Sequence, residues 1–92
     1  MTNIELTDKE LRMISDILKV SNNWDMDEWE DIKQDNYTYF EGKDILENDK
    51  EYWKNEQSVG GVMASLEKKS FIDRDGNEWC ISEECIEYFL NK

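Results

Sequence analysis

The stretch from Ser58 to Ser82 constrains the fold of this chain most, because it predicts a helix followed at once by a hairpin. Its first half has apolar residues at the spacing i, i+3, i+4 and i+7, which gives a helix one apolar face. These residues are Val59, Val62, Met63 and Leu66. Its second half has two apolar runs, Phe71-Ile72 and Trp79-Cys80-Ile81, on either side of Asp75-Gly76-Asn77. A short glycine-containing segment between two such runs indicates a β-hairpin.

An earlier helix is predicted near the N-terminus by its start signals. Thr7 and Glu10 have the spacing of a capping box, in which each side chain accepts a hydrogen bond from the other residue's backbone N–H. Leu6 and Leu11 occupy the two positions of a hydrophobic staple around that cap. We expect the helix to end near Val20, because the polar residues that follow it are typical of a loop.

The remaining elements are predicted from caps and composition. Asp25 is expected to cap a short helix, and the aromatic, β-branched segment Tyr37–Phe40 predicts a short strand. Asp44 is the expected cap of a helix that breaks near Asn48 and Asp49, and Ser58 is the expected cap of the central helix. After the hairpin, Ser82 is the expected cap of a closing helix.

This order of elements resembles a winged helix-turn-helix domain, of the kind found in MarR-type and small phage-encoded regulators. The pattern V-x-x-S-L-x-K-K-S-F-I followed by D-R-D-G-N, within 62–77, is similar to the recognition helix and wing of that family. The resemblance implies an α+β fold class, a small winged-helix-like domain in which helices carry a short β-hairpin wing. It implies one domain over residues 1–92 with an acidic insertion at about 24–36. One departure is Ser70, where the family usually has glycine to end the helix.

Composition limits the class of protein. An apolar content of 38% and eleven aromatic residues in 92 predict a globular domain with a modest core. No apolar run approaches the length of a membrane span, and no basic region followed by an apolar one marks a signal peptide. We therefore expect a cytoplasmic protein with no membrane partner, whose two cysteines are reduced.

The net charge of −12 argues against direct binding of nucleic acid, which depends on cations placed at phosphates. If the resemblance extends to function, the central helix and wing would contact DNA through Ser65, Lys68, Lys69 and Arg74. The three basic residues among them, Lys68, Lys69 and Arg74, are few for a DNA-binding protein. The protein would then be a transcriptional regulator acting as a homodimer, since the motif usually binds paired half-sites.

The acids are concentrated before the central helix, with ten acidic residues and two lysines from Trp24 to Asp49. Three interpretations stay open: a solvated face, a docking surface for a basic protein, and a DNA mimic whose carboxylates replace phosphates. In the docking interpretation the two tryptophans are anchors; if both are buried, the segment is a structural lid instead. The residues expected to contact the partner are Trp24, Asp25, Asp27, Glu28, Trp29, Glu30, Asp31 and Asp35.

Catalytic and metal sites have little support in the sequence. The chain has no histidine, no phosphate-binding glycine loop and no nucleophile motif, so we expect no catalytic residue. Two cysteines without histidine cannot complete a zinc site in one chain, and we expect no metal and no cofactor. Our leading hypothesis is a non-enzymatic protein-binding module, a phage-encoded inhibitor or DNA mimic that engages a basic, nucleic-acid-binding site on a partner.

Overall fold

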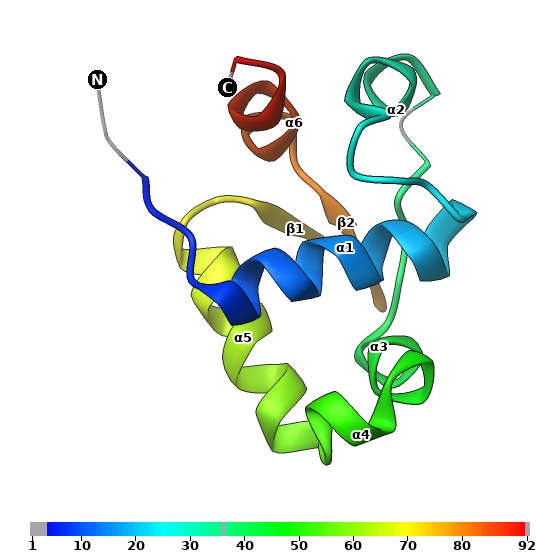
Figure 1. Ribbon diagram of the computed structural model, residues 1–92, viewed down its shortest axis with the longest axis vertical. Helices are drawn as coiled ribbons and strands as arrows, with labels where there is room; N and C mark the ends of the chain where they lie inside the picture. The colour runs from blue at the N-terminus through cyan, green and yellow to red at the C-terminus, as the bar shows by residue number, and fades with distance from the viewer. Residues whose placement is uncertain (1–3, 36, 92) are drawn as a thin grey trace.

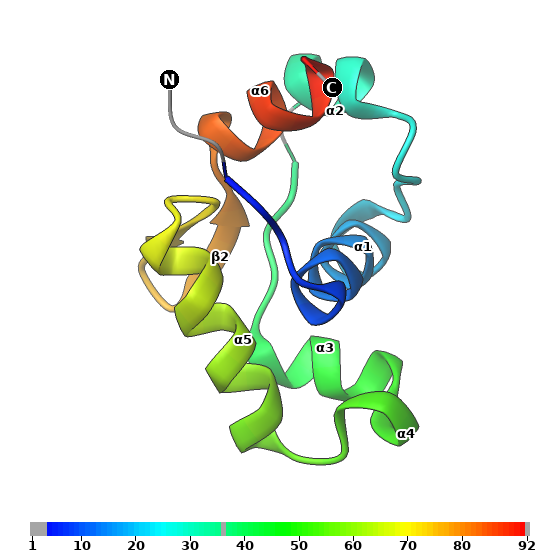
Figure 2. The same ribbon diagram turned by 60° about the vertical axis from the view of Figure 1, so that its left-hand side comes forward.

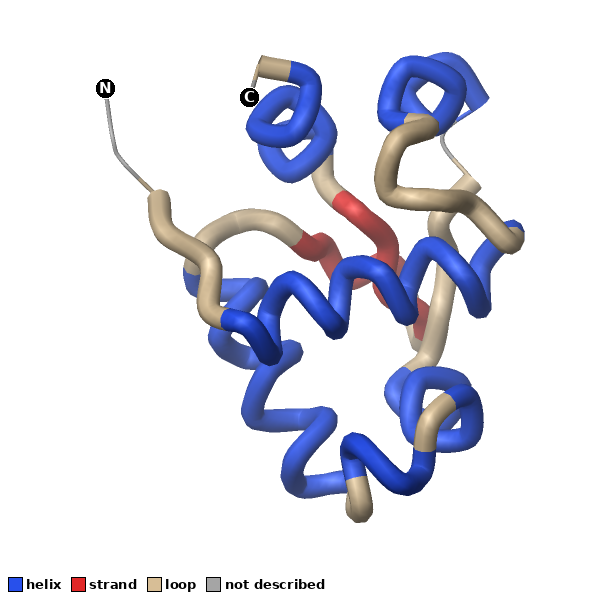
Figure 3. The backbone as a smooth tube through the Cα atoms, in the orientation of Figure 1, coloured by secondary structure: helices blue, strands red, loops and turns tan. Residues whose placement is uncertain are grey.

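The computed structural model describes residues 4–35 and 37–91. In this part of the chain six helices and one two-stranded antiparallel hairpin form a small α+β fold, which confirms the predicted fold class (Figures 1 and 3). In chain order the elements are α1 (Asp8–Asn22), α2 (Trp29–Asp35), α3 (Gly42–Asn48), α4 (Lys50–Trp53), α5 (Glu56–Lys68), β1 (Ile72–Asp75), β2 (Glu78–Ile81) and α6 (Glu83–Leu90).

Helix α1 begins as its start signals predict. The backbone N–H of Glu10 donates to Thr7 Oγ1 at 3.1 Å, and the N–H of Thr7 donates to Glu10 Oε1 at 2.8 Å, so the capping box is confirmed. The helix ends two residues beyond Val20, at Asn22. Asn23 then adopts a left-handed conformation with φ 53°, which asparagine tolerates better than most residues, and this terminates the helix.

The hairpin pairs Ile72 with Ile81 and Asp75 with Glu78, which leaves a two-residue turn. Gly76 in that turn has φ 66°, a conformation that favours glycine. The predicted strand Tyr37–Phe40 is reduced to one bridge, in which Phe40 exchanges two backbone hydrogen bonds with Trp79, at 2.8 and 2.9 Å. The ladder stops there because the N–H of Ile81 donates to the side-chain Oγ1 of Thr38, at 3.0 Å.

Three predicted helix starts are displaced by a few residues, whereas the cap at Ser82 is confirmed. Asp44 does not cap α3 but occupies its third position, where its carboxylate accepts from the N–H of Glu41 at 3.1 Å. Asn55, not Ser58, caps α5, since Asn55 Oδ1 accepts from the N–H of Ser58 at 2.9 Å. In each pair both residues are polar and three apart, a spacing that suits either one as the cap.

Helix α2 begins at Trp29, later than a cap at Asp25 would give. Asp25 and Glu28 form a separate turn instead: the N–H of Glu28 donates to the carbonyl of Asp25 at 3.1 Å, and Glu28 Oε1 accepts from the N–H of Asp25 at 2.9 Å. The predicted break near Asn48 and Asp49 is confirmed, and Asp49 caps α4 by accepting from the N–H of Tyr52 at 3.2 Å.

The core lies where α1, α3 and α5 pack together against the hairpin (Figure 2). Val59, Met63 and Leu66 of the predicted stripe are buried, and Val62 is half-buried at its edge. Helix α5 ends at Lys68, and two residues later Ser70 has a φ of 63°, the conformation usual for a glycine that terminates a helix. Within the described ranges, no helix combines the length and the apolar character needed to cross a membrane.

Candidate functional site

Helices α2 and α6 lie side by side at one end of the molecule, opposite the end that holds α3 and α4 (Figures 1 and 2). Their contact is centred on Trp29 and Phe89, whose rings stack with centroids 4.5 Å apart and planes 2° apart. Trp29 is only 5% exposed, so it packs inside the protein and is not an exposed anchor for a partner. The stack fixes the acidic segment before Asp35 against α6.

The half-buried Trp24 has a similar supporting role. Its indole Nε1 donates to the backbone carbonyl of Tyr37 at 3.0 Å, which ties the start of the acidic segment to the extended chain that follows α2. The two tryptophans therefore hold the segment in place from within, and the side chains that it offers to solvent are mainly carboxylates.

The packing of α2 on α6 brings carboxylates from two distant parts of the sequence onto one end of the molecule. We call this set the acidic surface; apart from the half-buried Glu28, its members are exposed. It consists of Asp25, Asp27, Glu28, Glu30, Asp31, Asp35, Glu83, Glu84 and Glu87. The last three were not predicted as site residues: Glu83 and Glu84 lie in the first turn of α6, where acids favour the helix N-terminus, and Glu87 has no local signal.

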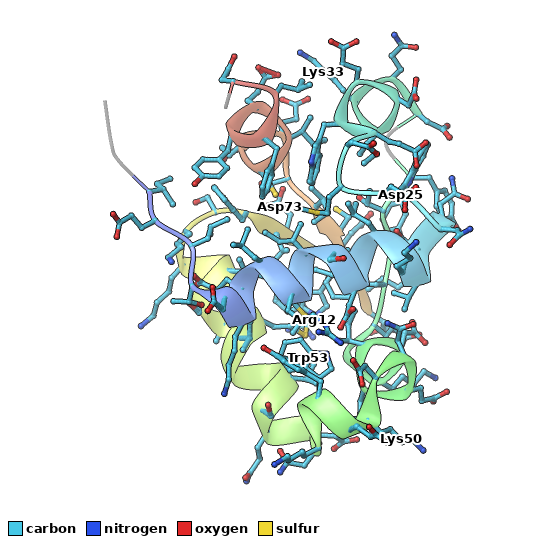
Figure 4. The ribbon with its side chains drawn as sticks, viewed as in Figure 1. Arg12, Asp25, Lys33, Lys50, Trp53 and Asp73 are labelled. Atoms are coloured by element: carbon cyan, nitrogen blue, oxygen red, sulfur yellow. The ribbon has the colours of Figure 1, made fainter. Side chains whose placement is uncertain are left out.

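Only two lysines neutralise part of the acidic surface among the described residues. Lys33, the one basic residue of α2 and α6, lies between the two helices, with its Nζ 2.7 Å from Glu87 Oε2 (Figure 4). That hydrogen bond raises the pKa of Lys33 above its usual value. Lys19 of α1 pairs with Asp25 at 3.0 Å, at the other end of the segment. The other carboxylates of the surface have no ion pair within the described ranges.

A hollow of about 440 Å³ opens within the acidic surface, at the turn before α2 and the end of α6. Its apolar lining comes from Met26, Trp29, Phe89 and Leu90, and its acidic lining from Asp27, Glu28, Glu30 and Asp31. A smaller hollow of about 190 Å³ lies on the same two helices and is lined by Lys33, Glu83, Ile86 and Glu87. The acidic surface thus combines carboxylates with recesses that expose apolar side chains.

The residues expected to contact DNA are partly occupied inside the protein. Ser65 Oγ donates to Glu10 Oε2, and Lys69 Nζ lies 2.6 Å from Glu10 Oε1 and 2.8 Å from the carbonyl of Glu5. Burial, which leaves Glu10 1% exposed, raises its pKa, but hydrogen bonds from Lys69, Ser65 and the N–H of Thr7 outweigh it and lower the pKa to about 2. Ser65 and Lys69 therefore face α1 and not the outer side of α5.

The outer side of α5 has few side chains able to read a base. Lys68 is exposed at the end of the helix, and Arg74 lies on the hairpin with its guanidinium carbon 5.5 Å from the ring centroid of Trp79. Gly60 and Gly61 are exposed, and a methyl group added to either would meet no atom within 4 Å. Base recognition relies mainly on Arg, Lys, Asn and Gln, so this helix offers little for that purpose.

Two groups of the described residues bear on catalysis and metal binding, the cysteines and a cluster of acids. Burial raises the pKa of the Cys80 and Cys85 thiols, so neither is activated as a thiolate at neutral pH. Carboxylate oxygens of Asp25, Asp27 and Glu28 lie within 4.8 Å of one another, an arrangement that exposed acids often show without a metal. Comparison with protein families, curated proteins and solved structures finds no match for this chain.

Proposed function

We propose that this protein is a non-enzymatic protein-binding module whose acidic surface engages a cationic, nucleic-acid-binding site on a larger partner, as an inhibitor or DNA mimic would. The observation that supports this proposal is that nine carboxylates from two remote segments lie at the α2–α6 end of the molecule, where the two helices carry a single lysine. A charge concentrated on one end attracts a cationic partner over a long range and orients it during the encounter.

The fold supplies a scaffold for that surface. A winged-helix-like arrangement is supported by the helix α5 that leads into the hairpin, and by the bridge that joins Phe40 to Trp79 of the wing. The acidic segment is inserted between α1 and this bridge and then packs on α6. In this proposal the winged-helix frame is retained for stability, while the working surface lies at the α2–α6 end, because fold alone does not decide function.

The alternative function is a winged-helix DNA-binding regulator. The exposed Lys68 and Arg74, at the end of α5 and on the wing, support it. The engagement of Ser65 and Lys69 with Glu10 counts against it, because two of the four expected contacts are used within the protein. Binding to random duplex DNA at low salt distinguishes the alternatives: a regulator binds with strong salt dependence, and the protein-binding module does not bind.

The central experiment compares two variants of equal charge in affinity capture from cells that encode the protein. The test variant neutralises four acids of the acidic surface: Asp27→Asn, Glu30→Gln, Asp31→Asn and Glu84→Gln. The control variant neutralises four exposed acids elsewhere: Glu47→Gln, Glu51→Gln, Glu67→Gln and Glu78→Gln.

The captured proteins are quantified by mass spectrometry with and without competing duplex DNA. We expect cationic nucleic-acid-binding proteins to be captured by the wild type and the control variant, lost from the test variant, and released by the DNA. Equal capture by both variants contradicts the proposal, because it shows that position on the acidic surface has no effect. If the competing DNA does not release the captured proteins, the DNA-mimic interpretation is excluded. The acidic surface is then a docking surface for a different basic site.

A further inference from the structure

The hollow at the turn before α2 differs from the rest of the acidic surface because apolar side chains line it. Met26, Phe89 and Leu90 are half-buried and lie against the core without being enclosed by it. A volume of about 440 Å³ accommodates one or two large apolar side chains from another molecule. A surface that only kept the protein soluble would not need such a recess.

The charge around this hollow is of one sign. The four ionisable residues that line it, Asp27, Glu28, Glu30 and Asp31, are all acids. The two lysines near the acidic surface are already paired, Lys19 with Asp25 and Lys33 with Glu87, so neither neutralises the lining. Three lining carboxylates, those of Asp27, Glu30 and Asp31, have no ion pair within residues 4–35 and 37–91.

Trp29, which also lines the hollow, has a side-chain donor that differs from that of Trp53. Its Nε1–H is buried and has no hydrogen-bond acceptor in the part of the chain that the structure describes. Trp53, by contrast, donates its Nε1–H to Asp16 Oδ2 at 2.7 Å. The Nε1 atom of Trp29 is therefore enclosed and is not itself a contact for another molecule, but the ring that carries it lines the hollow and reports on what binds there.

We propose that this hollow binds a cationic amphipathic segment of a protein partner, with an apolar side chain between Met26, Phe89 and Leu90. Lysine or arginine residues beside that side chain pair with Asp27, Glu30 and Asp31. Nucleic acids and anionic lipid surfaces are repelled by the same carboxylates. The inference rests on the proposed function and names the part of the partner that is recognised.

The probes are two cationic peptides of about 15 residues with identical composition. One places its leucines on one face of a helix with lysines and arginines beside them, and the other has the same residues scrambled. Calorimetry at physiological salt measures their affinities for the intact protein. We expect the amphipathic peptide to bind at least about tenfold more tightly than the scrambled one, since burial of one or two apolar side chains separates them.

The hollow is tested with Met26→Ser, matched by Val62→Ser, which removes a half-buried apolar side chain from α5 instead. Met26→Ser should lower the affinity for the amphipathic peptide about tenfold and leave the affinity for the scrambled peptide unchanged. Val62→Ser should change neither affinity. Far-UV circular dichroism confirms that both variants are folded. If Met26→Ser has no effect, or both peptides bind wild type equally, the hollow is not the binding site and this proposal is overturned.

The indole of Trp29 gives a second readout by NMR, with its N–H signal assigned from Trp29→Phe. The Trp29 signal should shift on addition of the amphipathic peptide, while the Trp53 signal, already bonded to Asp16, stays in place. An unchanged Trp29 signal at saturating peptide contradicts binding at the hollow that its ring lines. If the peptides fail this test but the acidic-surface variant still loses its partners, the proposed function stands without the hollow. If neither acidic-surface capture nor peptide binding is observed, both proposals fall.

Discussion

The ring of Trp29 lies parallel to the ring of Phe89, at a centroid distance of 4.5 Å, and this contact joins α2 to α6. The two residues are sixty positions apart in the chain, so the contact brings acids into one surface that are remote in sequence. Because the same two rings also line the hollow, the stack supports the fold and shapes the candidate site.

We expect this stack to contribute measurably to stability. Trp29→Ala should lower the free energy of unfolding by about 3–5 kcal/mol, since it removes a buried ring. A double-mutant cycle of Trp29→Leu and Phe89→Leu should give a coupling of about 0.5–1.5 kcal/mol. Urea denaturation followed by circular dichroism measures both. Tyr37→Leu, at a position 52% exposed, is the control and should change stability by less than about 0.5 kcal/mol; additive single mutants would show that the ring contact contributes nothing.

The carboxyl group of Glu10 should make stability depend on pH in the acid range. Its pKa of about 2 in the folded protein lies below the ordinary value of 4.5, so its contribution is complete above about pH 4.5 and is lost as the pH falls toward 2. The shift corresponds to the order of 3 kcal/mol. The stability difference between wild type and Glu10→Gln should therefore be largest at pH 7 and decrease by that order near pH 2.

The matched control for Glu10 is Glu67→Gln, at an exposed position of α5 without an ion pair in the described ranges. Urea denaturation at several pH values should show that the free energy of unfolding of Glu67→Gln differs little from that of the wild type, and that this difference stays nearly constant. A Glu10→Gln difference that does not change between pH 7 and pH 2.5 would contradict the role given to Lys69 and Ser65.

Replacing glycine with alanine should have opposite effects on stability in helix α5 and at the hairpin turn. Gly60→Ala and Gly61→Ala should each raise the free energy of unfolding by about 0.5–1 kcal/mol, because both lie inside α5 and the added methyl groups meet no atom within 4 Å. Gly76→Ala should lower it by about 1 kcal/mol, since φ at the hairpin turn is 66°. Thermal unfolding measures all three, and a destabilising Gly60→Ala would contradict the open space beside this position.

Ser70→Gly should stabilise the protein by about 0.5–1 kcal/mol, because it relieves a left-handed conformation with φ 63° at the end of α5. Ser70→Ala retains a β-carbon and is the control that should give no gain. Urea denaturation of the two variants decides the matter: equal stabilities would mean that the conformation at this position carries no strain.

Signals that act over three or four residues were predicted well. The capping box of Thr7 and Glu10, the turn at Gly76 and the cap at Ser82 follow from groups that are close in sequence, and the structure confirms them. Two displaced starts show the limit of this approach. Asp44 and Ser58 each lie three residues after another polar residue, and only packing of the helix decides which of the two becomes the cap.

The sequence predicted only part of the candidate site. The carboxylates from Asp25 to Asp35 are dense enough to be noticed in the sequence, whereas Glu87 belongs to the same surface only because α6 packs on α2. The expected DNA contacts show the reverse case. Ser65 of α5 and Lys69 just after it have suitable chemistry in the sequence, but Glu10 of α1 binds both.

The sequence by itself determined the local structure: the central helix, the hairpin after it, the caps at Thr7 and Ser82, and the strong excess of acids. Tertiary structure decided which side chains face solvent and which acids are neighbours. It placed Trp29 inside, against Phe89, and turned Lys69 toward Glu10. The physical reason is range: caps and turns depend on adjacent residues, whereas burial and charge clustering depend on which faces of remote helices pack together.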